Sequence, residues 1–221
     1  MIEKLKTYKG NYKTLIFDLD GTLNNTKEGI EFCFKKTLDE YGISYEGVDF
    51  NRHIGPPLEW SFKELVGGDN WQDALIAYRK NFVECNAVMM SKLYDGVEVM
   101  LKKLKESGRY AMCVASSKYE PAAIESLTRF NVIHYFDNVY AQNERRGFKN
   151  EILAQLISEN GYDKQTCLMI GDTHYDIDGA RENSLDVVGV TYGFESRQQI
   201  VESKPDAIVD SALELLDLLL D

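Results

Sequence analysis

A chain of 221 residues is long enough for one globular domain, or for one domain with a smaller appendage. It carries 36 acidic residues against 25 lysines and arginines, which gives a net charge of −11. This balance argues against nucleic acid and anionic membranes as partners, because affinity for both depends on lysine and arginine next to phosphates.

The N-terminus and the cysteines predict where the protein is found. Residues 1–13 contain lysines but no apolar stretch with a cleavage site, so they do not resemble a signal peptide. No run reaches the ~18 apolar residues that a membrane-spanning helix needs. Four widely spaced cysteines in apolar surroundings favour reduced core side chains over disulfides; they are Cys33, Cys85, Cys113 and Cys167. We expect a cytoplasmic protein that is a monomer or a homodimer.

Apolar, strand-like runs alternate with helical patterns over most of the chain. The predicted strands are 13–18, 110–117, 136–142, 166–172, 186–193 and 206–210. The predicted helices between and after them include 96–108, 149–161, 176–184 and 211–220. Strands that are apolar throughout and separated by helices are typical of a parallel sheet covered on both faces. The predicted fold class is therefore α/β, a doubly wound, Rossmann-like parallel-sheet core.

One segment, residues 24–90, interrupts this alternation. It has no convincing buried strand and shows helical spacing of apolar residues in 26–42, 58–68 and 71–86. Because it begins directly after the first strand, a helical insert would lie over the carboxyl edge of the sheet. We predict a core domain of residues 1–23 and 91–221, with an inserted helical cap domain of residues 24–90.

Polar side chains follow three of the predicted strands at the point where each strand ends. They are Asp18 and Asp20, then Ser116 and Ser117, then Asp172 with Asp176 four residues further on. Ligands of open parallel sheets bind in the crevice beyond the carboxyl ends of the strands. The sequence therefore predicts a ligand site at this edge.

The pair in "DLDGT", residues 18–22, does not suit two common motifs. A hairpin turn needs a second strand, but the residues that follow are helical in pattern. An EF-hand loop needs glycine at its sixth position, whereas Gly21 is fourth from Asp18. In an extended chain Asp18 and Asp20 project to the same side. Carboxylates gathered at one edge repel each other unless a cation lies between them, and oxygen ligands with a phosphate favour Mg²⁺.

Four motifs, in this order and context, resemble those of the haloacid dehalogenase superfamily of phosphotransferases. They are "DLDGT", Ser116 after the second core strand, Lys149 at the start of a helix, and "GDTHYDID" at 171–178. The longer stretch 171–194 and "IGPPL" at 54–58 are similar to the phosphoglycolate phosphatase-like branch, whose cap is a helical insertion after the first strand. The resemblance covers nearly the whole chain. It implies a Mg²⁺-dependent hydrolase of a small phosphorylated metabolite that works through an aspartyl-phosphate.

The resemblance also implies roles for the residues at these positions. Asp18 would be the nucleophile, and Asp20 the general acid and then the base. Lys149 would supply positive charge to the phosphoryl group and to Asp18. The predicted metal-binding residues are Asp18, Asp20 through its backbone carbonyl, Asp172 and Asp176. The predicted substrate-binding residues are Gly21, Thr22, Arg52, Ser116 and Ser117.

Several of these residues have other interpretations. Ser116 and Ser117 suit the N-cap of the helix that follows. The role of Lys149 has competitors in Arg145, Arg146 and Lys164, all of which suit a solvated surface. His174 lies in the acidic loop, where it either contacts substrate or faces solvent.

The core motifs do not decide the reaction completely. Asp20 favours phosphoryl chemistry over dehalogenation, but β-phosphoglucomutases share both aspartates and a similar cap. A phosphotransferase of that kind, a nucleotidase and a pyrophosphatase therefore stay open as alternatives. A non-catalytic binding protein of this fold is the least favoured, since it would be expected to lack Asp18, Asp20 or the acidic loop.

The insert must select the substrate. Arg52 and His53 are candidates to meet an anionic or hydroxylated leaving group, and the stiff loop Gly55-Pro56-Pro57 is placed to enter the site. The alternative is that Arg52 is a surface charge and that the apolar residues after the loop pack within the cap.

Overall fold

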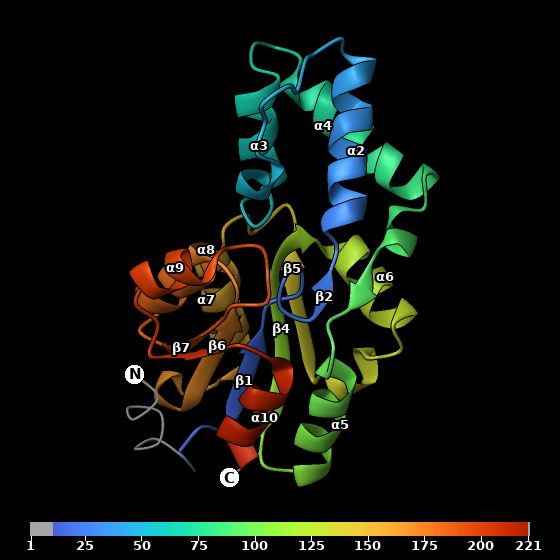
Figure 1. Ribbon diagram of the computed structural model, residues 1–221. Helices are drawn as coiled ribbons and strands as arrows, with labels where there is room; N and C mark the ends of the chain where they lie inside the picture. The colour runs from blue at the N-terminus through green and yellow to red at the C-terminus, as the bar shows by residue number, and fades with distance from the viewer. Residues whose placement is uncertain (1–10, 221) are drawn as a thin grey trace.

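The computed structural model describes residues 11–220. Most of the N-terminal segment that we compared with a signal peptide lies outside the described residues, as do residues 1–10 of the predicted core range 1–23. Figure 1 shows an α/β layer with a group of helices above one end of its strands.

Six strands form one sheet in which all neighbours are parallel, in the order β5-β4-β1-β6-β7-β8. The strands are β1 (Thr14–Phe17), β4 (Ala111–Tyr119), β5 (Asn138–Gln142), β6 (Cys167–Gly171), β7 (Asp186–Val190) and β8 (Ala207–Val209). From β1 the chain builds the sheet first to one side, through β4 and β5, and then to the other. The order therefore reverses at β1, where ligands of such sheets bind.

Helices cover both faces of the sheet because successive residues of a strand point to opposite sides. Leu15 and Phe17 lie in the core on one side, and Ile16 lies in the core on the other. The helices of the first side are α5 (Val97–Ser107), α6 (Glu120–Arg129) and α10 (Ala212–Leu220). Those of the second are α7 (Lys149–Asn160), α8 (His174–Glu182) and α9 (Arg197–Glu202). The predicted doubly wound α/β core is confirmed.

Residues 24–90, called the cap from here on, are mainly helical. Its elements are α2 (Lys27–Glu40), α3 (Leu58–Leu65), α4 (Trp71–Glu84) and the short 3₁₀ helices η1 (Phe50–His53) and η2 (Ala87–Met90). The cap has its own apolar core, in which Phe34, Phe62 and Tyr78 meet with ring centroids 4.9–5.4 Å apart. The boundaries 23/24 and 90/91 stay a sequence-based prediction.

Two short strands connect the cap to the core. β2 (Asn24–Asn25) and β3 (Lys92–Leu93) pair antiparallel, so the chain enters and leaves the cap side by side. The Asn24 amide donates a hydrogen bond of 2.8 Å to the Ser126 hydroxyl of α6. These contacts place the cap above the carboxyl ends of the core strands (Figure 1).

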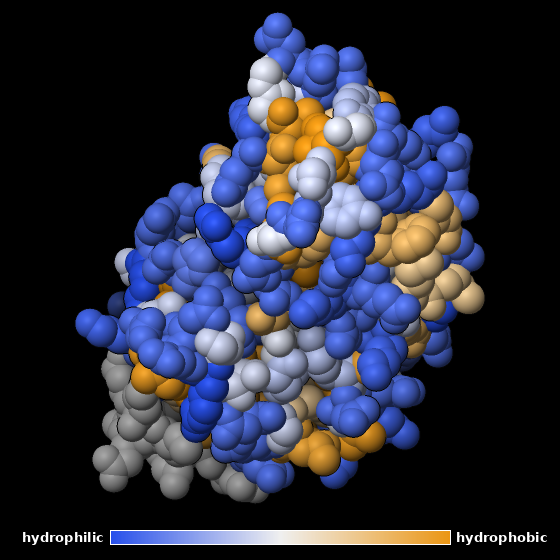
Figure 2. Space-filling model, turned by 45° about the horizontal axis from the view of Figure 1, so that its top comes forward, coloured by the Kyte–Doolittle hydropathy of each residue, from blue (hydrophilic) through white to orange (hydrophobic). Residues whose placement is uncertain are grey.

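The face drawn in Figure 2 is mostly hydrophilic, with a hydrophobic patch on the cap. This agrees with a chain in which 28% of the residues are charged. In residues 11–220 every helix is too short or too polar to cross a bilayer. All four cysteines are unpaired, with Cys85 half-buried and the others buried.

Candidate active site

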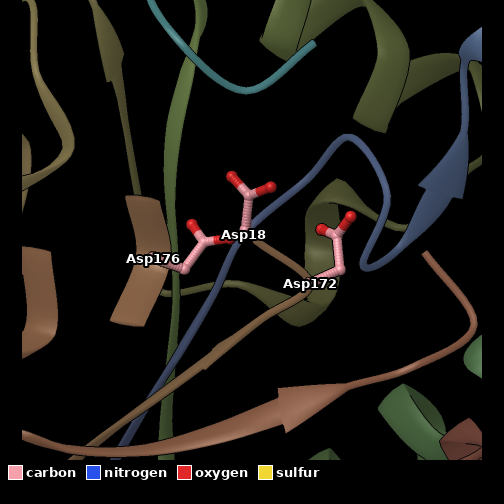
Figure 3. A group of neighbouring side chains, drawn as sticks. All are labelled: Asp18, Asp172 and Asp176. Atoms are coloured by element: carbon pink, nitrogen blue, oxygen red, sulfur yellow. The ribbon is translucent and has the colours of Figure 1, made fainter. Parts of the chain in front are cut away.

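Three carboxylates meet where β1 and β6 end. Oxygens of Asp18, Asp172 and Asp176 all lie within 4.8 Å of one another, and all three side chains are buried. Figure 3 shows them pointing to the same side, with a segment of the cap passing above them. Asp18 is held at this point because its backbone N–H continues the pairing with β6, at 2.9 Å from the carbonyl of Ile170.

Burial and mutual repulsion make these carboxylates hard to ionise together. Burial raises the pKa of Asp18 to about 7, although the positive charge of Lys149 opposes this effect. Burial also raises the pKa of Asp172, and the charges of Asp176 and Asp18 raise it further. A hard divalent cation would remove this repulsion, and an all-oxygen donor set suits Mg²⁺. The residues present therefore fit the metal that the sequence predicts.

Glycines leave room for the Asp172 side chain. A Cβ on Gly21 would lie 2.1 Å from Oδ2 of Asp172, and one on Gly193 would lie 2.3 Å from its Cβ. Gly21 also has a φ of +97°, which side chains rarely allow. The glycine in "DLDGT" is therefore explained by backbone conformation and by the approach of the carboxylate.

Hydrogen bonds fix both acidic residues of the second motif. Asp172 accepts one from the Thr22 hydroxyl at 2.9 Å and one from the backbone N–H of Phe194 at 2.9 Å. Asp176 uses Oδ2 to cap α8, accepting from the backbone N–H and the hydroxyl of Thr173. Thr22, which we predicted to bind substrate, thus contacts the acidic cluster directly.

Lys149 joins two of the three carboxylates. Its Nζ lies 2.5 Å from Oδ1 of Asp18 and 2.8 Å from Oδ1 of Asp176, and it donates to the carbonyl of Ala115 at 2.8 Å. Burial alone would lower the pKa of Lys149, but the charges of Asp176 and Asp18 raise it above its ordinary value. Gly179 of α8 makes space for the lysine, since a Cβ there would lie 2.8 Å from its Cγ.

The other cationic residues that we considered for this role lie elsewhere. Arg146 forms an ion pair with Glu120 and a hydrogen bond to Gln155. Arg145, Arg146 and Lys164 line a shallow groove that does not include the carboxylates. Of the four candidates, Lys149 is the one beside Asp18.

Asp20 is paired with a lysine that sequence analysis did not single out. Nζ of Lys118 lies 2.8 Å from Oδ2 of Asp20, and both side chains are largely buried. Oδ1 of Asp20 is also buried and finds no hydrogen-bond partner within residues 11–220, so it is available to a proton. The available signal was the position of Lys118, two residues after Ser116. We had ended that strand at 117, whereas β4 continues to Tyr119.

The two serines lie beside the carboxylates. Ser116 is buried, and both Ser116 and Ser117 line the cavity that contains Asp18 and Asp20. Tyr119 is the N-cap of α6, so neither serine caps that helix.

Arg52 does not enter this cavity. Its side chain is 66% exposed and lies 3.5 Å from Glu64 on the cap. The adjacent His53 is buried and lines the cavity, and burial lowers its pKa. His174 lies outside the lining, where its Nδ1 contacts the carboxylate of Glu195.

The cavity, of about 190 Å³, lies between the core and the cap. The core contributes the charged and hydroxyl groups described above. The cap contributes mostly apolar side chains and one cation; its lining residues include Ile30, Ile54, Leu58, Tyr78, Arg79 and Phe82. Gly55, with a φ of +108°, brings the proline loop against α8, since a Cβ there would lie 3.4 Å from the Tyr175 ring. The predicted loop of the insert therefore packs on the start of α8 and lines the cavity that contains Asp18 and Asp176.

Curated relatives share most of their length with this chain. A 5'-nucleotidase of Pseudomonas aeruginosa is 32% identical over 200 residues, which cover 88% of this chain and 89% of that protein. Pyrophosphatase PpaX of Halalkalibacterium halodurans is 31% identical over 211 residues, which cover 93% of this chain and 95% of that protein. Tyrosine-protein kinase PtkA of Mycobacterium tuberculosis is 30% identical over 207 residues, which cover 92% of this chain and 70% of that protein.

Solved structures show the same fold. A predicted phosphatase from Clostridium acetobutylicum has a TM-score of 0.86 and 32% identity, covering 95% of this chain and 98% of that one. A predicted phosphoglycolate phosphatase from Haemophilus somnus has a TM-score of 0.81 and 25% identity, covering 94% and 98%. Residues 15–190 match the sequence model of the family described as Haloacid dehalogenase-like hydrolase. The chain therefore belongs to the haloacid dehalogenase-like hydrolase family, as one of its phosphatases.

Proposed function

We propose that this phosphatase is a Mg²⁺-dependent phosphomonoester hydrolase that works through an aspartyl-phosphate. The observation that carries the proposal is the pairing of two carboxylates, buried Asp18 and half-buried Asp20, with two lysines in one cavity. Asp18 is held by Lys149, and Asp20 is held by Lys118 while its second oxygen stays free. The two carboxylates thus have different environments, as a nucleophile and a proton donor require.

The first step divides between the two aspartates. An oxygen of Asp18 attacks phosphorus, and the bond from phosphorus to the leaving oxygen breaks. Asp20 donates a proton to that oxygen, so the leaving group departs as a neutral alcohol. In the second step Asp20 accepts a proton from water, whose oxygen attacks the phosphorus of the aspartyl-phosphate. Orthophosphate forms, and the Asp18 carboxylate is restored.

Positive charge around the phosphoryl group supports both steps. Lys149 lies beside Asp18 and would offset charge on the phosphoryl oxygens, and Ser116, which lines the same cavity, would donate a hydrogen bond to one of them. Asp18, Asp172 and the backbone carbonyl of Asp20 would hold Mg²⁺, with Asp176 supporting the ion or its waters. When bound, Mg²⁺ would add positive charge to the phosphoryl oxygens and to the buried carboxylates.

The proposed substrate is a small phosphorylated metabolite similar to phosphoglycolate. A cavity of about 190 Å³ supports a small leaving group. Pyrophosphate and nucleoside monophosphates are the second candidates, because the relatives named above include a pyrophosphatase and a 5'-nucleotidase. Transfer to a sugar hydroxyl, as in β-phosphoglucomutases, remains the phosphotransferase alternative. A cytoplasmic location and a monomeric or homodimeric state remain predictions from the sequence.

The test is release of orthophosphate from a panel of phosphate monoesters and pyrophosphate, with and without Mg²⁺. The panel contains p-nitrophenyl phosphate, phosphoglycolate, pyrophosphate, nucleoside monophosphates and hexose phosphates. We expect Asp18→Asn to lower kcat at least about 1000-fold. The matched control is Asp178→Asn, an exposed carboxylate of the same acidic segment, which should stay within about twofold of the parent. Activity retained by Asp18→Asn would contradict the mechanism, and hexose phosphate conversion with little orthophosphate would support the phosphotransferase.

A further inference from the structure

Three side chains with a permanent positive charge line the cavity: Lys149, Lys118 and Arg79. Two of them are already paired with carboxylates of the core. Lys149 contacts Asp18 and Asp176, and Lys118 contacts Asp20. Their charges are therefore largely neutralised before a substrate arrives.

Arg79 is different, because no described residue forms an ion pair or a side-chain hydrogen bond with it. Its Nε is buried and has no hydrogen-bond partner in the part of the chain that the structure describes. Its guanidinium carbon lies 4.7 Å from the centre of the Tyr119 ring, at the end of β4. A buried hydrogen-bond donor without a partner is unfavourable, because it has lost its bond to water and gained none in the protein. A ligand that supplies an acceptor is therefore favoured here.

The place of Arg79 in the cavity indicates which part of a substrate it would meet. Arg79 lies on α4 next to Tyr78, and Phe82 is one turn further along the same helix. Phe82 in turn lies over Lys118, whose Nζ is 4.9 Å from its ring centroid. The phosphoryl-binding groups lie on the core side, so the cap wall that carries Arg79 faces the leaving group.

The chemistry of arginine restricts the partner. Its planar guanidinium pairs with the two oxygens of a carboxylate or phosphate, and such charged hydrogen bonds strengthen in an apolar surrounding. The other arginine that we considered from the sequence, Arg52, lies outside the cavity beside Glu64.

We propose that Arg79 is a specificity-determining residue that binds a second anionic group, a carboxylate or a phosphate, on the leaving group. This inference rests on the proposed phosphomonoester hydrolysis and adds to it the class of leaving group. It predicts that the enzyme prefers substrates with two anionic ends.

The test compares substrates with and without the second anion in matched variants. The substrates are phosphoglycolate, with a carboxylate, pyrophosphate, with a phosphate, and ethyl phosphate and p-nitrophenyl phosphate, with neither. Arg79→Gln should lower kcat/KM for a doubly anionic substrate about 10- to 100-fold, mainly through KM, because it removes a charged hydrogen-bonded pair. For the two esters with an uncharged leaving group, kcat/KM should stay within about threefold of the parent. Arg79→Lys should keep part of the preference. The control is Lys80→Gln, an exposed cation on the same helix that lies 3.7 Å from Glu84.

The outcomes separate this inference from the proposed function. If Arg79→Gln slows all four substrates equally, or none, Arg79 only packs on Tyr119 and the inference is overturned. The substrate whose kcat/KM falls more in Arg79→Gln identifies the second anion, a carboxylate if it is phosphoglycolate and a phosphate if it is pyrophosphate. Asp18-dependent hydrolysis of the two esters with an uncharged leaving group supports the proposed function in either case.

A binding measurement covers the case in which no ester is hydrolysed. Calorimetry with 3-phosphonopropionate and propylphosphonate then replaces kinetics, because neither needs to react. A preference for the first ligand that Arg79→Gln abolishes supports the inference. Equal binding of both ligands by the parent protein overturns it.

Discussion

Replacing Gly21 by alanine tests the packing of the acidic cluster. The new Cβ would lie 2.1 Å from Oδ2 of Asp172, and the backbone φ there is +97°. Moving Asp172 would break its hydrogen bonds with Thr22 and Phe194, both 2.9 Å. We expect about 1–2 kcal/mol from the backbone and about 1–3 kcal/mol from overpacking, hence a loss of about 2–5 kcal/mol in the free energy of unfolding.

The matched control is Gly47→Ala. Gly47 has a φ of +79°, but a Cβ there would meet nothing within 4 Å. The Gly47→Ala variant should lose only the backbone contribution, about 1–2 kcal/mol in the free energy of unfolding, and keep its phosphatase activity. Urea unfolding measures both losses, and Gly21→Ala should also lower kcat at least about 100-fold because Asp172 moves. Equal losses of stability, with full activity in Gly21→Ala, would refute the reasoning.

Three further predictions concern the lysines and the carboxylates. Lys149→Met should lower kcat at least about 1000-fold with p-nitrophenyl phosphate. Its control, Lys164→Met, changes a lysine of the shallow groove and should have little effect on kcat. Similar rates in the two variants would contradict the role of Lys149. Lys118→Met should lower kcat about 10-fold, because Asp20 loses the lysine that holds it. Its control is Lys102→Met, which removes an exposed lysine paired with Glu106. An unchanged kcat in Lys118→Met would exclude Lys118 as a positioning residue. In Mg²⁺-free buffer Asp172→Asn should melt at a higher temperature than the parent near about pH 8, with the difference shrinking towards about pH 5. The sign follows because a raised pKa in the folded state means that stability falls as pH rises above the ordinary carboxyl pKa. Saturating Mg²⁺ should raise the melting temperature of the parent about 5–10 °C, so that the parent then melts above Asp172→Asn. If Asp172→Asn still melts at the higher temperature in Mg²⁺, a metal at this cluster is contradicted.

The fold followed from local patterns that tertiary contacts reinforce. The four residues of β1 are all buried because helices cover both faces of the sheet, and this is why three apolar residues follow Thr14 without alternation. The carboxyl ends of parallel strands meet at one edge, so the sequence alone predicts that Asp18 and Asp172, 154 positions apart in the chain, lie at the same edge.

The residues that sequence analysis did not place are those whose position depends on contact between cap and core. The periodicity of α4 indicates a buried face, but not that Arg79 would lie at the rim of that face, above Tyr119. Arg52 and His53 are neighbours in the chain, yet η1 turns His53 inward and leaves Arg52 exposed. These side-chain orientations depend on a short 3₁₀ turn and on the packing of the cap against the core, and no local sequence motif predicts either.

The charge partners were also hidden from the sequence. Lys118 contacts Asp20 because β4 extends past the two serines, so the lysine lies on a strand end and not in the following helix. Thr22 was predicted to bind substrate, and the structure adds that its hydroxyl donates to Asp172. Motifs give the residue types at an edge, whereas pairing among them depends on side-chain geometry.

The most direct measurement of the central claim is detection of the aspartyl-phosphate. The protein is mixed with p-nitrophenyl phosphate and Mg²⁺, quenched in acid and digested, and the peptides are analysed by mass spectrometry. Asp20→Asn should accumulate the intermediate, because the residue that activates water is lost. We predict one added phosphoryl group on the peptide that contains Asp18, and none in Asp18→Asn. Orthophosphate formed at an undiminished rate by Asp18→Asn, with no phosphorylated peptide, would contradict the account.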